Sequence, residues 1–250
     1  MLMEVQENCL IQSPVLGTLR RRLSALVFHF GQFTSHLSFR PSEVAFLAFP
    51  SRHFPSQPSV TPVNVLVAPS NYHSLKASYA QIPGVNVQPF RLRPQDLNVS
   101  SMLSLMSVDQ SHSTPLYISQ ITRILREMAC TSFKSFSYIE FKRHLQSSKL
   151  SRAQLGPLQQ RLELLESFLV LDDSAQDFSF GTDGVTIIDL SCPFVDAHMA
   201  CVLFNISIDL YLGSGLTTGK IIAIDEAHKV CLIPRWSLTP HFVEHKNDGM

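Results

Sequence analysis

The sequence predicts an α/β protein with a parallel sheet and a helical insert. Two short, β-branched runs, "VNVLVAP" and "GVTIIDLS", have the composition of buried strands, and each is followed by a helical pattern. Four further segments between residues 96 and 170 place apolar residues three and four positions apart, which is typical of helices that bury one side. Strands that alternate with helices favour a parallel sheet.

Length and composition set the domain organisation that we expect. The chain has 250 residues and is 45% hydrophobic, enough to bury a full core. The Pro- and Ser-rich stretch "FPSRHFPSQPSVTP" favours a linker, so we place a boundary near Pro62. Residues 1–62 are then a basic N-terminal segment with a linker. Residues 63–250 are the α/β domain, with its helical insert at about 96–170.

Charge is balanced overall but unevenly distributed. Net charge is zero, yet Glu43 is the only acid between residues 9 and 95, whereas acids predominate in the last third. A basic leader can contact nucleic acid or act as an organellar transit peptide, and an unstructured segment is the simpler alternative. No apolar run reaches the roughly 20 residues that cross a bilayer, so we expect a soluble protein without a membrane partner. The five cysteines form no C-x-x-C pair, which favours a reduced, intracellular location.

The elements after Pro62 are expected in a definite order. Residues 63–69 form a strand, residues 70–82 a helix capped by Ser70, and residues 85–90 a second strand. The four helices of the insert follow, at residues 96–107, 115–130, 137–146 and 151–170. Residues 184–191 and 220–226 are strands joined by a long apolar helix at residues 194–212, which predicts a parallel crossover.

Two acidic residues stand where these last strands end. The carboxyl ends of parallel strands form the edge at which open α/β sheets bind ligands, which places Asp189 and Asp225 there. In "KIIAIDEAHKV", an apolar strand runs into Asp225 and Glu226, as in a Walker B motif. There the Asp organises Mg²⁺ and the Glu activates water. The alternative is a strand that simply ends in two solvated acids.

A phosphate-binding loop does not accompany these acids. The pattern G-x-x-x-x-G-K-[ST] is absent from the sequence, and "GSGLTTGK", residues 213–220, has the wrong spacing and precedes a strand. We expect that stretch to be a helix C-cap and turn. A DEAH-box helicase motif or a metal site at His228, His241 and His245 is disfavoured by the missing partner motifs and ligand spacing. No nucleophilic triad can be assigned to Ser191 or Cys192.

Taken in order, several segments resemble the HerA/FtsK-type P-loop ATPases, in particular diverged fungal forms. They are "VNVLVAPSNYHSLKASY", "LRPQDLNVSSMLSLMSV", "PLYISQITRILREM", "GVTIIDLS" and "GKIIAIDEAHKV", and together they span about residues 63–230. The resemblance implies a partial P-loop NTPase sheet, ATP and Mg²⁺ as cofactors, a ring of like or unlike ATPase subunits, and DNA as a partner.

The same resemblance assigns roles to single residues. Asp225 would organise the metal, Glu226 would be the catalytic acid that activates water, and Asp189 would contact the cofactor. Without the loop that holds the triphosphate, we expect a truncated or degenerate member with weak or absent hydrolysis. The alternative function is a non-catalytic module that docks on an intact ATPase subunit or another partner. We also expect "EVAFLAFP", residues 43–50, to substitute for a missing strand.

Overall fold

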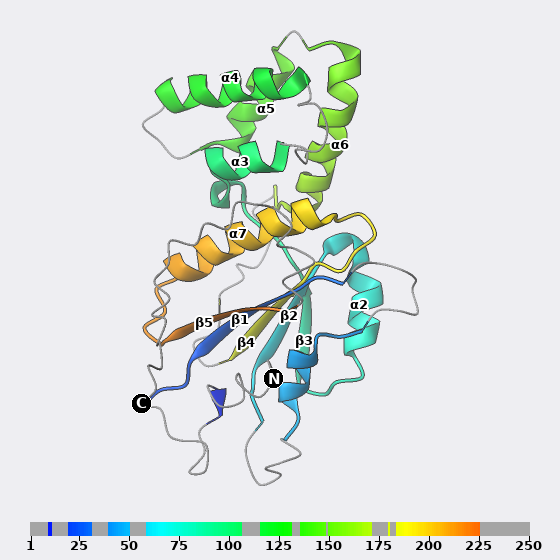
Figure 1. The fold of residues 1–250 in the computed structure, drawn as a ribbon, viewed down its shortest axis with the longest axis vertical. Helices are drawn as coiled ribbons and strands as arrows, with labels where there is room; N and C mark the ends of the chain where they lie inside the picture. The colour runs from blue at the N-terminus through cyan, green and yellow to red at the C-terminus, as the bar shows by residue number, and fades with distance from the viewer. Residues whose placement is uncertain are drawn as a thin grey trace, which may run out of the picture.

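The computed structural model describes residues 10–11, 20–31, 40–50, 59–106, 116–131, 136–148, 150–171, 180 and 184–225. Within them, five parallel strands form one sheet in the order β3-β2-β4-β1-β5 (Figure 1). The strands are β1 (Ser24–His29), β2 (Val63–Val67), β3 (Val85–Pro89), β4 (Val185–Asp189) and β5 (Lys220–Ile224). The predicted α/β class and parallel sheet are confirmed.

Helices connect and cover these strands. The α-helices are α2 (Tyr72–Tyr79), α3 (Val99–Met106), α4 (Leu116–Thr131), α5 (Tyr138–Gln146), α6 (Arg152–Phe168) and α7 (Ala197–Gly213), with short 3-10 helices η1 (Glu43–Ala48), η2 (Pro69–Asn71) and η3 (Pro94–Asp96). The four expected helices between the second and third predicted strands are present as α3 to α6. Among the described residues, no helix is both long and apolar enough to cross a membrane.

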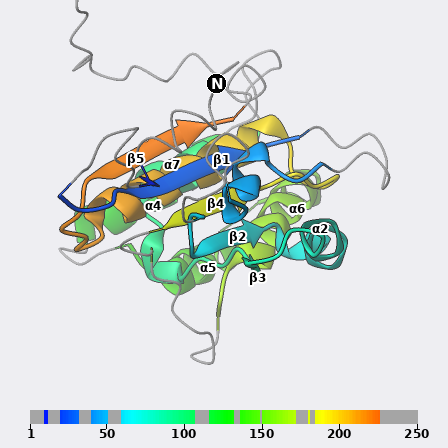
Figure 2. The same ribbon diagram turned by 90° about the horizontal axis from the view of Figure 1, so that it is seen from below.

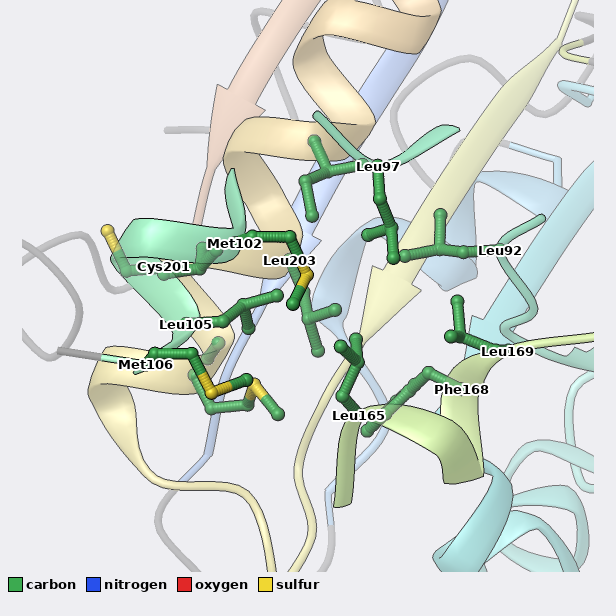
Figure 3. Close-up of a cluster of buried hydrophobic side chains, with 14 of the residues drawn as sticks. Leu92, Leu97, Met102, Leu105, Met106, Leu165, Phe168, Leu169, Cys201 and Leu203 are labelled. Atoms are coloured by element: carbon green, nitrogen blue, oxygen red, sulfur yellow. The ribbon is translucent and has the colours of Figure 1, made fainter. Parts of the chain in front are cut away.

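One face of the sheet packs against α7, and the helical insert lies beyond α7 (Figure 1). Phe28 of β1 contacts Phe204 of α7, with ring centroids 4.5 Å apart. Figure 3 shows how the insert joins this core: Met102 and Leu105 of α3 and Leu165 of α6 lie close to Leu203 of α7. These side chains are buried, so the insert is anchored to the sheet through α7.

The opposite face of the sheet is covered by α2 and η1. Tyr79 and Leu75 of α2 and Val44 of η1 are buried against the strands. The 17-residue α7 thus fills one layer, and shorter helices fill the other. All five residues of β4, at the centre of the sheet, are buried, as a parallel strand covered on both faces must be.

The N-terminal segment contributes an interior strand, but at a different place from the one expected. Residues 24–29 form β1, which pairs with β4 on one side and β5 on the other. The expectation that residues 43–50 supply a strand is wrong, because Glu43–Ala48 is the 3-10 helix η1. The apolar run "LSALVFHF" suits an interior strand, because all of its strand residues up to Phe28 are buried there. Residues on both sides of Pro62 therefore belong to the same sheet.

The cap expected for α2 is also different. Asn71 is the N-cap, and its side chain makes no capping hydrogen bond to the helix. Pro69 and Ser70 lie in the preceding turn η2 instead. The hydroxyl of Ser70 lies 3.1 Å from the sulfur of Cys192, so it is used to join two loops.

Candidate functional site

Three polar residues lie in one row at the carboxyl edge of the sheet. In the strand register, His29 of β1 is the partner of Asp189 of β4, and Phe28 is the partner of Ile224 in β5, which places Asp225 level with His29. Paired residues of parallel strands project their side chains to the same face. We name Asp225, His29 and Asp189 the edge row; it lies on the face covered by α2 and η1.

Asp225 is held by both its backbone and its side chain. Its backbone N–H donates to the carbonyl of Phe28 at 2.8 Å, which extends the ladder between β1 and β5 by one bond. Its Oδ2 lies 2.9 Å from Nδ1 of His29. The side chains are 23% and 14% exposed, so this pair is largely shielded yet open to solvent on one side. A carboxylate in that position can accept a hydrogen bond from imidazole or bind a cation.

Asp189 has a different environment, because it is completely buried. The hydroxyl of Tyr79 donates to its Oδ2 at 2.8 Å, and the N–H of Ser191 donates to its Oδ1 at 2.9 Å. The Tyr79 hydroxyl also accepts the N–H of Ser42 at 3.0 Å. Asp189 thereby joins the loop after β4 to α2 and to the start of η1. Its predicted contact with a cofactor stays a prediction, and its burial favours a structural role.

Burial controls the chemistry of Tyr79. Desolvation raises the pKa of its hydroxyl well above the usual value of 10.0, and the nearby negative charge of Asp189 raises that pKa further. Asp225 adds a smaller contribution in the same direction. The hydroxyl therefore keeps its proton and acts as a donor to Asp189, which a buried carboxylate requires.

The loops that follow β1, β2 and β4 are tied together beside the edge row. Gly31, after β1, donates its N–H to Oγ of Ser191 at 2.8 Å. Asn71, after β2, donates from Nδ2 to the carbonyl of Ser191 at 2.8 Å. Ser191 is buried, so its hydroxyl serves as an acceptor within this junction. These bonds give the carboxyl edge a fixed shape, as a preformed binding edge would need.

Residues 213–220, which partly match the phosphate-binding pattern, lie at the amino ends of the strands, opposite the edge row. α7 ends at Gly213, and the carbonyl of Gly219 accepts the N–H of Ser24, at the first residue of β1. The expected helix end is confirmed, and the C-cap is Ser214 with an extended backbone. Five strand residues at about 3.3 Å each put this turn roughly 16 Å from Asp225. It cannot hold phosphates beside the edge row.

Part of the predicted site lies outside the described residues. The structure does not describe Glu226, nor does it describe His228, His241 and His245, for which a metal site was disfavoured. Within the described part of the chain, no group of three or more His, Cys, Asp or Glu side chains is arranged to hold a metal ion. The metal role of Asp225 and the catalytic role of Glu226 stay predictions. Comparisons of this chain with protein-family models, curated proteins and solved structures found no match.

Sequence reasoning identified the two acids of this edge but missed their partners. His29 lies 196 positions from Asp225 in the chain, and Tyr79 lies 110 positions from Asp189. No local pattern connects such residues. Only the parity of positions along "LSALVFHF", with His29 two residues after buried Val27, could have suggested that His29 shares a face with the core.

Proposed function

We propose that this chain is a P-loop ATPase-like protein of the HerA/FtsK type, an AAA-like relative of DNA translocases, in which ATP hydrolysis is weak or absent. The observation that carries the proposal is the edge row. Asp225 follows a parallel strand of apolar residues at the edge where open α/β sheets bind ligands. That is the place and residue type that a magnesium-organising acid requires in such ATPases.

Weak hydrolysis follows from what surrounds Asp225. His29 approaches its Oδ2 to 2.9 Å, so Mg²⁺ must compete with imidazole for this oxygen. Asp189, the second acid, is enclosed by Tyr79 and the Ser191 N–H. The sequence has no loop of amides with a Lys to neutralise a triphosphate, and uncompensated carboxylates repel phosphates.

Isothermal titration with ATP and Mg²⁺ tests this proposal. We expect no saturable binding at micromolar ATP and no phosphate release above background. Asp225→Asn should leave both results unchanged. Asp209→Asn, at an exposed position on α7, is the matched control for the loss of one carboxylate. Micromolar affinity that Asp225→Asn abolishes and Asp209→Asn preserves would show that the chain binds ATP as an intact ATPase does.

A second candidate is a non-catalytic module that docks on an ATPase subunit through the helical insert. The observation that favours it is apolar exposure on the insert: Ile139 of α5 is 64% exposed and Leu155 of α6 is 39% exposed. Sedimentation of the chain with a HerA/FtsK-type ATPase of the same cell tests it. A stoichiometric complex that Ile139→Asp and Leu155→Asp disrupt supports this candidate. A complex that both variants leave intact counts against docking through this surface.

A further inference from the structure

We propose that the outer edge of β5 pairs antiparallel with β5 of a second copy of this chain, so that two sheets join across a two-fold axis. Within the described residues, β5 pairs with β1 on one side and with no strand on the other. It forms one end of the sheet, and β3 forms the opposite end, as Figure 2 shows from below. This pairing is independent of nucleotide binding.

The hydrogen-bonding groups of β5 that face outward can be identified from its bonds to β1. The carbonyl of Gly219 accepts from Ser24, and the N–H of Asp225 donates to Phe28. Backbone groups of alternate residues in a strand point to opposite sides. The odd-numbered residues therefore bond to β1. Lys220, Ile222 and Ile224 direct their N–H and C=O groups away from the sheet.

The composition of β5 does not match its exposed position. Its sequence, "KIIAI", is that of an interior parallel strand. Yet every residue of β5 is at least partly exposed, whereas β4, of similar composition, is buried throughout. The exposure reaches 37% at Ile222, and Leu212, near the end of α7, is 56% exposed. Covering the outer edge of β5 would bury apolar surface that water now contacts.

The outer edge of β5 also lacks the features that keep sheet edges apart. A charged side chain or a proline usually protects an edge strand. Lys220 is the only charged residue of β5, and its Nζ is directed back to the carbonyls of Leu212 and Ser214, at the end of α7. In contrast, β3 carries the polar Asn86 and Gln88 and ends at Pro89, so its edge is protected.

The difference between the two edges selects the occupant. Pairing of β5 with β3 of another copy would build an open chain of subunits, and the polar, proline-ended β3 disfavours it. Pairing of β5 with itself uses one surface twice and closes after two copies. A two-fold axis makes that pairing antiparallel. With the axis at Ile222, Lys220 of each copy faces Ile224 of the other, and all three outward-facing residues exchange hydrogen bonds.

Amide hydrogen exchange and sedimentation of the full chain test this pairing. We expect a monomer–dimer equilibrium, and we expect exchange at Lys220, Ile222 and Ile224 to slow as concentration rises over about a hundredfold range. Exchange at Ile221 and Ala223, whose amides bond to β1, should not depend on concentration.

Ile222→Pro is the decisive variant, because it removes an N–H that bonds to nothing in the described sheet and so spares the β1 pairing. It should raise the dimer dissociation constant at least about tenfold. Ile222→Lys should act in the same direction by adding a charge to the edge. Phe194→Lys is the control for adding a lysine in place of an exposed apolar residue. Phe194 is 67% exposed and lies in the loop before α7, distant from β5 in the chain.

Each of the other outcomes overturns the pairing. Rapid exchange of the outward amides at all concentrations would mean that nothing covers the edge. Slow exchange in a monomer would mean that the chain's own residues cover it. A dimer that Ile222→Pro and Ile222→Lys leave intact would place the interface elsewhere.

Discussion

Tyr79→Phe tests whether the buried junction around Asp189 stabilises the fold. The substitution keeps the ring but removes the hydroxyl that donates to Asp189 at 2.8 Å and accepts from the Ser42 N–H at 3.0 Å. All three residues are buried, and the variant therefore leaves a carboxylate without one donor and an N–H without its acceptor. A hydrogen bond to a charged group contributes about 1.5–3 kcal/mol, and an unsatisfied buried N–H costs about 1–3 kcal/mol. We expect the free energy of unfolding to fall by about 2.5–6 kcal/mol, the combined range of these two costs.

Urea denaturation followed by circular dichroism measures this loss. Tyr72→Phe is the matched control, because the hydroxyl of Tyr72 accepts only an exposed hydrogen bond from Lys76 in the same helix. Its loss should change stability by less than about 0.5 kcal/mol. In a double-mutant cycle with Asp189→Asn, we expect a coupling energy of about 1–3 kcal/mol. Equal midpoints for Tyr79→Phe and Tyr72→Phe would refute the claim that the buried hydroxyl supports Asp189.

Three further predictions concern pH, the edge pair and two glycines. Because the pKa of Tyr79 is raised in the folded chain, the unfolded chain loses this proton first as pH rises, so the stability that depends on the proton is constant below pH 10.0 and is lost above it. Between pH 10 and 11, the free energy of unfolding of the native chain should therefore fall more steeply than that of Tyr79→Phe. Equal slopes would contradict the assignment. Asp225→Asn should lower the free energy of unfolding in urea by about 1 kcal/mol more than Asp209→Asn, since only Asp225 lies 2.9 Å from His29 in a largely shielded pair. An equal loss in both variants would mean that the pair contributes nothing to stability. Gly184→Ala should lower stability by about 2–4 kcal/mol in thermal unfolding, because the added Cβ would lie 2.5 Å from the carbonyl oxygen of Pro62. In contrast, the Cβ of Gly156→Ala in α6 would meet no atom within 4 Å, so this variant should be neutral or stabilising. The opposite order of stabilities would disprove the steric argument.

Local sequence patterns predicted most of the elements and two residues of the edge row. Apolar periodicity placed four of the five strands and all six described α-helices near their observed positions, because burial of one side or both sides gives a repeating apolar pattern. The pattern of an apolar strand followed by an acid placed Asp189 and Asp225 at the carboxyl edge. Both signals are local, and neither depends on which strands become neighbours.

The remaining features could not be predicted in this way, because pairing between strands depends on contacts distant in the chain. Residues 24–29 occupy an interior position of the sheet, although the N-terminal segment gave no strand signal that distinguished them from residues 43–50. Because β1 lies between β4 and β5, His29 is beside Asp225 and level with Asp189, and the apolar β5 is at the edge of the sheet. The strand order is set by which apolar segments can be buried together, and a single sequence records each segment without recording its neighbours.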